Sequence, residues 1–237
     1  MPTETTKSIF WSGVRDAAPF ILVVGPFGLL FGVVATESGL NVLETMTFSI
    51  LVIAGAAQLT ALQLLTDNAP TIIVIISALA VNLRMAMYSA SLAPYIGPAP
   101  LWQRACAAYF LVDQSYGLAI LKYEAYPKWN VRQRIVYFFG TIAPVCPFWY
   151  LATLTGALIG TSVPDWLALD FAMPITFIAL IAPALRTRAH VAAALVSIVV
   201  ALSLAFLPYN LGLLVAGIAG MMTGAEVERR TEEWAKA

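Results

Sequence analysis

Charged residues are scarce in this chain of 237 residues: Lys, Arg, Asp and Glu make up 11% of it, whereas soluble domains carry roughly 25%. Long polar stretches are also missing, and 60% of the residues are hydrophobic. This composition excludes an ordinary soluble domain and leaves little chain for an extramembrane one. The net charge is zero, so nucleic acid is not an expected partner.

Cysteine and histidine are almost absent. Cys106 and Cys146 have no metal-ligand spacing and fall in or near hydrophobic segments, where we expect them to pack as small apolar residues. The one histidine, His190, starts a hydrophobic segment and is expected at the cytoplasmic interface. No Walker motif and no Ser/His/Asp arrangement is visible. We therefore expect no enzyme, no resident metal and no cofactor.

Hydrophobic segments are what the chain does contain. There are eight, each close to the roughly 20 residues that a spanning helix needs. They cover residues 17–36, 44–65, 70–92, 104–121, 135–158, 167–185, 189–207 and 209–224. We predict an all-α, polytopic transmembrane helix bundle that forms one integral membrane domain over residues 1–237, in contact with the lipid bilayer.

The positive charges are distributed unevenly between these segments. If the gaps are numbered alternately from the N-terminus, the odd-numbered side carries nearly all Lys and Arg. Its members are Lys7, Arg15, Lys122, Lys128, Arg132, Arg134, Arg186, Arg188, Arg229, Arg230 and Lys236. The even-numbered side carries only Arg104, and Arg84 lies inside a segment. By the positive-inside rule, both termini are cytoplasmic.

A weak internal repeat is visible when the first half is shifted by about 120 residues, because Pro26 then aligns with Pro147 and Gly39 with Gly160. Four spans per unit would make this repeat parallel, a 4+4 arrangement. Duplicated bundles are common in secondary transporters, with the substrate site between the halves. Chance similarity of two apolar stretches is the alternative.

Two of the segments contain features that point to a site in the membrane. Gly25-Pro26-Phe27-Gly28 is either a broken helix that lines a substrate site or a packing kink, because Pro and Gly both weaken a helix. Gln58, near the middle of its segment, must find hydrogen-bond partners. It either bonds to a neighbouring helix or contacts the substrate.

Charges inside hydrophobic segments are the strongest signal, since they are costly at that depth and usually functional. Arg84 lies between Asn82 and Tyr88 in the chain. Arg84 and Tyr88 are four residues apart and share a helix face, but Asn82 cannot lie on that face as well. Arg84 could meet a substrate carboxylate or close a structural ion pair. Asp113 could pair with Arg84, bind a substrate ammonium group or take up a proton. The sequence leaves these alternatives open.

These residues resemble the AzlC family of branched-chain amino-acid exporters over about residues 13–224. The resemblance is carried by four motifs in order. They are GVRDAAPFILVVGPFGLLFGVVATESGL at 13–40, AGAAQLTALQLL at 54–65, VNLRMAMYSASLAP at 81–94 and LVDQSYGLA at 111–119.

The resemblance implies a multi-pass permease of the bacterial inner membrane (plasma membrane) that exports leucine, isoleucine, valine and sometimes methionine. It also implies a small AzlD-like membrane protein as partner. The sequence departs from the family pattern where Met85 stands in place of a histidine, and where Val112 and Gln114 flank Asp113 in place of Thr and Glu. Two titratable groups are thereby lost, which argues against proton coupling through these positions.

The sequence therefore predicts an exporter that works by alternating access. Its expected substrate-binding residues are Arg84, Asp113, Gln58, Asn82, Gly25, Pro26 and Tyr88. The alternatives are a non-transporting membrane scaffold subunit, in which Arg84 and Asp113 form a structural pair, and an exporter of a different small zwitterion.

Overall fold

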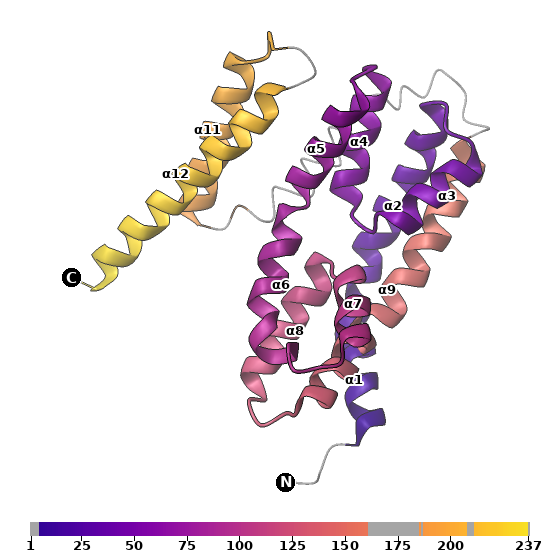
Figure 1. Cartoon of the computed structure of the whole chain (residues 1–237), viewed down its shortest axis with the longest axis vertical. Coiled ribbons are helices and arrows are strands. Elements are labelled where there is room, and N and C mark those ends of the chain that lie inside the picture. Colours follow the sequence, from indigo (N-terminus) through magenta and orange to yellow (C-terminus); the bar gives the residue numbers. More distant parts are fainter. Residues whose placement is uncertain (1–4, 161–184, 186, 208–210, 237) are drawn as a thin grey trace. The chain divides into compact units, whose positions relative to one another are not determined.

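The computed structural model describes residues 5–160, 185, 187–207 and 211–236, and every element in this part of the chain is a helix (Figure 1). The first group comprises α1 (Thr6–Ala17), the 3-10 turn η1 (Ala18–Phe20), α2 (Ile21–Glu37), α3 (Val42–Leu51), α4 (Gly55–Thr66), α5 (Thr71–Val81) and α6 (Leu83–Ile96). The second comprises α7 (Leu101–Tyr109), α8 (Asp113–Ala125), α9 (Val131–Gly160), α11 (Arg188–Ser203) and α12 (Leu211–Lys236). The all-α membrane bundle predicted from composition is confirmed.

Helix α9 is the longest described helix, and α1 and α2 lie along it (Figure 1). Glycines make this approach close: a Cβ on Gly13 would lie 2.6 Å from the Tyr137 carbonyl oxygen, and a Cβ on Gly32 would lie 2.6 Å from the Ala157 nitrogen. Residue numbers rise together along both partners, so α1–α2 and α9 run parallel. Small residues are what membrane helices use to pack at this distance, because lipid provides no hydrophobic drive.

Four of the expected spans correspond to apolar helices of membrane-crossing length. These are Thr6–Glu37, Thr71–Ile96, Val131–Gly160 and Leu211–Thr231. The expected span at 189–207 is the shorter apolar helix α11, and the one at 167–185 lies outside the described residues except for its last position. The parallel repeat needs that segment, so it stays a prediction.

Two expected spans are not continuous helices. The segment 44–65 divides into α3 and α4, because Val52 adopts an extended conformation with φ −127° and ψ 92°. The segment 104–121 divides into α7 and α8, because Val112 is extended with φ −133° and ψ 166°. A milder interruption separates α5 from α6 at Asn82.

The α7–α8 segment enters the bundle and returns to the same end, as two contacts along α6 indicate. Arg84 pairs with Asp113 near the start of both α6 and α8, and Tyr95 packs on Tyr123 near the end of both. Helices α6 and α8 therefore run parallel, and the short α7 between them must run the opposite way. The segment 104–121 is therefore a helical hairpin and not the one continuous helix expected of a span.

The end of the bundle where this hairpin begins is also where α9 begins. The Arg134 guanidinium donates to the Tyr95 and Pro127 carbonyl oxygens, at 3.2 and 3.1 Å. Arg104, near the start of α7, therefore lies toward the same end, and its assignment to the opposite side is wrong. The physical reason is that a hairpin reverses the chain without crossing.

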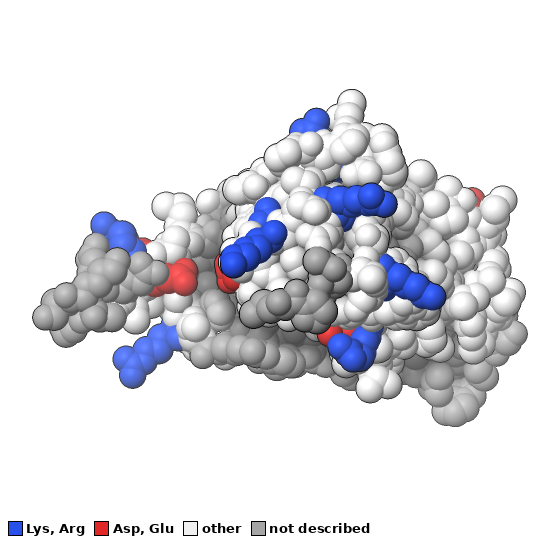
Figure 2. Space-filling model, turned by 90° about the horizontal axis from the view of Figure 1, so that it is seen from below, with Lys and Arg blue, Asp and Glu red and all other residues white. Residues whose placement is uncertain are grey.

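Lys and Arg side chains gather on this end, seen from below in Figure 2. Lys7 is in the first turns of α1, and Lys122 lies near the end of α8. Lys122 donates to Asp16 at 2.9 Å and so joins α8 to α1. With Arg104 at this end, the excess of Lys and Arg on the cytoplasmic side is larger, because Arg104 was the one residue assigned to the opposite side.

Contacts group the chain into two units, and the single-domain expectation remains a prediction. The first holds residues 1–59 and 81–167 and the second holds residues 60–80 and 168–237.

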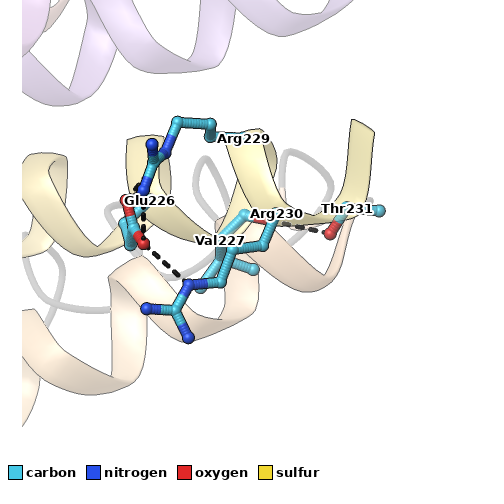
Figure 3. A network of polar contacts seen from close by, with 5 residues as sticks. All are labelled: Glu226, Val227, Arg229, Arg230 and Thr231. Carbon is cyan, nitrogen blue, oxygen red and sulfur yellow. Dashed lines mark hydrogen bonds and ion pairs between the residues drawn. The ribbon is translucent and has the colours of Figure 1, made fainter. Parts of the chain in front are cut away.

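In the second unit α11 and α12 are antiparallel, with Gly220 and Gly224 against Ser197 and Ala193. The end of α12 is polar: Glu226 pairs with Arg229 at 2.9 Å and with Arg230 at 2.7 Å (Figure 3).

We predict that Gly156→Ala destabilises the fold, because the added methyl group would meet the Leu29 backbone of α2. Overpacking of this kind costs roughly 1–3 kcal/mol. Thermal unfolding of the detergent-solubilised protein measures it. Gly117→Ala in α8 is the matched control, because nothing lies within 4 Å of its Cβ position and Ala favours a helix. Equal melting temperatures for the two variants would contradict the close α2–α9 packing.

Candidate functional site

The site lies where the two helix interruptions meet. Tyr109, the last residue of α7, donates its hydroxyl hydrogen to the Ile50 carbonyl oxygen of α3 at 2.6 Å. That carbonyl belongs to the last turn of α3, where the α3–α4 interruption leaves backbone acceptors without helical partners. Ile53, Phe110 and Val112 of the two interruptions all pack against one apolar cluster. The Tyr109–Ile50 hydrogen bond joins the end of α7 to the end of α3, next to each interruption.

Asp113 is the first residue of α8, and local hydrogen bonds hold it there. The Ser115 hydroxyl accepts from the Val112 N–H at 3.0 Å and donates to the Val112 carbonyl oxygen at 2.9 Å. This serine fixes the turn that begins the helix. A carboxylate at a helix N-terminus is stabilised by the unpaired N–H groups and the helix dipole. The interruption between α7 and α8 thus creates a favourable place for one negative charge.

Arg84 of α6 faces this carboxylate. Its Nη1 lies 3.1 Å from Asp113 Oδ2, and the Tyr88 hydroxyl donates to Asp113 Oδ1 at 3.0 Å. Asp113 precedes Tyr123 by ten residues of α8, so it lies roughly 15 Å along the helix from the end where Tyr123 packs on Tyr95. The side chains of Arg84 and Asp113 are 31% and 44% exposed, so both charges remain reachable.

An aromatic stack supports the pair. The rings of Tyr88 and Tyr116 are parallel within 8°, with centroids 4.1 Å apart. The hydroxyl groups of Tyr116 and Ser91 are 3.0 Å apart and hydrogen-bonded. The sequence does not indicate this stack, because it requires the parallel arrangement of α6 and α8 that the hairpin produces.

Three predicted site residues carry buried polar atoms that have no hydrogen-bond partner among the described residues. Gln58 of α4 is completely buried, and neither its amide nitrogen nor its amide oxygen has a hydrogen-bond partner in the structure. The Oδ1 of Asn82, at the α5–α6 interruption, is likewise buried without a partner, as is Nε of Arg84. The interhelix hydrogen bond considered for Gln58 is therefore not observed.

Of the two alternatives for Gly25 and Pro26, a broken helix and a packing kink, the structure shows packing. Helix α2 continues through Pro26, and a Cβ on Gly25 would lie 2.6 Å from the Phe148 ring, so these residues pack against α9. The nearby break is the one before Gly55, against which the Phe27 and Trp149 rings pack. Pro26 removes one helical hydrogen bond, and the continuous packing on α9 keeps the helix intact.

A model of the AzlC protein family matches residues 19–163, more than half of the chain and all of the site described above. The chain belongs to the AzlC family. This family is linked to membrane transport and is not a family of enzymes. The protein is accordingly a multi-pass inner-membrane protein, as its apolar helices indicate.

Curated relatives of this AzlC protein are similar over most of their length. The inner membrane protein YgaZ of Escherichia coli is 25% identical, over 92% of this chain and 89% of YgaZ. An uncharacterised membrane protein of Archaeoglobus fulgidus is 27% identical, over 93% and 96%. An uncharacterised membrane protein of Helicobacter pylori is 28% identical, over 72% and 75%. No solved structure matches.

Trp149 is a residue whose role sequence reasoning missed. It is buried in α9 of this AzlC protein, and its indole N–H donates to the Ser49 hydroxyl at 2.8 Å. It also contacts Phe27, with ring centroids 5.9 Å apart. Its place in the middle of a hydrophobic segment, away from the membrane interfaces where Trp is common, was the available signal.

Metal chemistry receives no support from the described part of the chain. Across residues 5–160, 187–207 and 211–236, no group of three or more His, Cys, Asp or Glu side chains could hold a metal ion. The site instead offers one cation, one anion, a tyrosine pair and unpaired amide groups. This set can bind a small molecule that carries both charges.

We predict that Arg84→Leu lowers the stability of the protein by about 1–3 kcal/mol, because it leaves the Asp113 carboxylate without its cation. The loss is smaller than the roughly 3–5 kcal/mol of a fully buried pair, since both side chains are partly exposed. The double variant Arg84→Leu/Asp113→Leu should regain most of it. Thermal unfolding of both variants measures this coupling; additive losses would show that the two side chains do not interact.

Proposed function

We propose that this AzlC protein exports branched-chain amino acids (leucine, isoleucine, valine and also methionine) by alternating access, together with a small AzlD-like membrane protein. The observation that carries the proposal is the Arg84–Asp113 ion pair. Its two side chains are partly exposed and come from two helices, beside the interruptions between helices. Membrane transporters use interrupted helices at mid-membrane to bind polar substrates. The substrate class and the partner are supported by the family resemblance.

The chemistry of the pair fits an amino-acid zwitterion. The substrate ammonium group replaces the Arg84 guanidinium at Asp113, and the substrate carboxylate replaces Asp113 at Arg84. Without substrate the two side chains neutralise each other, so neither charge is left unpaired in the membrane. The exchange keeps every charge compensated in both states, which lowers the cost of opening the site from either side.

The apolar part of the substrate needs a matching surface. The stacked rings of Tyr88 and Tyr116 lie directly beside Asp113 and present such a wall. Met85, partly buried next to Arg84 in the chain, adds a flexible apolar side chain that adapts to different aliphatic groups. Export of leucine, valine and methionine by one site is consistent with this adaptability.

One observation favours a second candidate, a non-transporting scaffold subunit. Arg84 and Asp113 contact each other directly, as a purely structural pair would. In that case Arg84→Asp combined with Asp113→Arg should preserve both assembly and any function of the complex. An exporter would lose transport in the same double variant, because the substrate ammonium group and carboxylate would each face a side chain of like charge. Another small zwitterion is the remaining alternative as substrate.

Efflux of preloaded radiolabelled valine, leucine and methionine from expressing cells tests the proposal. The assay is done with and without a co-expressed AzlD-like protein. We predict efflux above background for the wild type, and a loss of at least tenfold for Arg84→Ala and Asp113→Asn at equal membrane abundance. Arg104→Ala, which changes a charge outside the site, is the control and should retain wild-type efflux.

The outcomes separate the candidates. Efflux that depends on Arg84 supports the exporter. Wild-type efflux in both site variants would show that Arg84 and Asp113 do not bind the substrate. Absence of efflux of all three amino acids from cells that contain both proteins would exclude branched-chain amino-acid export.

A further inference from the structure

The start of α4 combines three properties that nothing in the Arg84–Asp113 site uses. The chain leaves helical geometry at Val52 and re-enters it at Gly55, so the first N–H groups of a 12-residue helix begin in the interior of the bundle. The N-terminus of a helix carries a partial positive charge. Gln58 is in the first turn of this helix, completely buried, with an unpaired amide group.

The side chain of Gln58 extends toward this helix start. In an α-helix every Cα–Cβ bond tilts toward the N-terminus, so a residue in the first turn reaches back over the preceding turn. We therefore expect the amide of Gln58 to lie near the start of α4. Among the neighbouring small residues, Ala54 and Ala57 are buried, and Gly55 is partly exposed beside the Phe27 ring.

A buried amide without partners is costly, by roughly 1–3 kcal/mol in proteins. An apolar residue of the same size would remove that cost, so Gln58 lowers the stability of the empty protein. Stability is commonly given up at binding sites, where the missing partner is the ligand. The ligand group that fits a positive helix end and an amide N–H donor is a carboxylate.

The place is connected to the site already described. The Tyr109 hydroxyl bonds to Ile50 before the break, and Asp113 follows Tyr109 by four residues at the neighbouring break. The rings of Phe27 and Trp149 close the side of Gly55 that faces α2 and α9. A ligand at the start of α4 would therefore be shielded by aromatic rings on that side.

We propose that the start of α4, with the Gln58 amide as donor, is the subsite that binds the carboxylate of the transported molecule. This inference rests on the proposed function for the identity of the substrate. It goes beyond it in assigning the carboxylate a second contact besides Arg84, one made by an amide and a backbone helix end rather than by a charged side chain.

Binding of isovalerate to the purified protein tests this subsite separately from transport. Isovalerate is valine without its ammonium group, so it keeps the branched chain and the carboxylate. Isovaleramide is the uncharged amide of isovalerate. We expect isovalerate to raise the melting temperature of the wild type, and isovaleramide to bind at least tenfold more weakly.

Three variants make the test specific. Gln58→Leu should raise the melting temperature of the unliganded protein by about 2–4 °C and weaken isovalerate binding about tenfold or more. Gln58→Glu should abolish that binding, because its charge repels the carboxylate. Gln63→Leu, on the same helix but exposed, is the matched control and should bind isovalerate as the wild type does.

Unchanged isovalerate affinity in Gln58→Leu and Gln58→Glu would overturn the inference, as would the absence of any isovalerate effect on the wild type. A lower melting temperature of Gln58→Leu with unchanged affinity would show that Gln58 is structural. The efflux assay decides the proposed function independently: loss of isovalerate binding with continued valine efflux would reject this subsite alone. Isovalerate binding without efflux would support the subsite and reject branched-chain amino-acid export.

Discussion

The electrostatic constraint on Arg84 and Asp113 determines how this part of the bundle is built. Neither charge can remain without a partner among apolar membrane helices, since an uncompensated charge there costs several kcal/mol. Their contact, together with that of Tyr95 and Tyr123, places α6 and α8 side by side and in the same direction. Parallel neighbours separated by only about 16 residues require a return segment, which is α7. The hairpin is thus a consequence of where the two charges must meet.

The rest of the first unit provides a firm support for this hairpin. Glycines bring α1 and α2 into backbone contact with α9, and the Ser49, Trp149 and Thr153 side chains join α3 to α9. These contacts are extensive and leave little freedom. The hairpin also packs against an apolar cluster, but polar contacts attach its tip and its base. Polar contacts can be exchanged for contacts with a substrate, whereas close-packed backbones cannot be exchanged in this way.

Much of the fold could be predicted because its signals are local and strong. Apolar length identified the crossing helices, and a charge in an apolar segment identified Arg84 and Asp113. The hairpin could not be predicted, because a segment of about 18 apolar residues has the same composition whether it crosses once or turns back. The interruptions at 52–54 and 110–112 contain neither Pro nor Gly, so no helix breaker indicates them. Pro26 was the stronger signal, yet packing on α9 keeps that helix continuous.

The central claim is that substrate competes for the Arg84–Asp113 contact. NMR of the purified protein with ¹⁵N- and ¹³C-labelled arginine side chains tests it directly, with the Arg84 signal assigned by comparison with Arg84→Lys. The account predicts that saturating valine shifts the Arg84 guanidinium signals, and that Asp113→Asn shifts them without ligand. Unchanged Arg84 signals at saturating valine would contradict the account, because they would show that the pair stays closed when the substrate is bound.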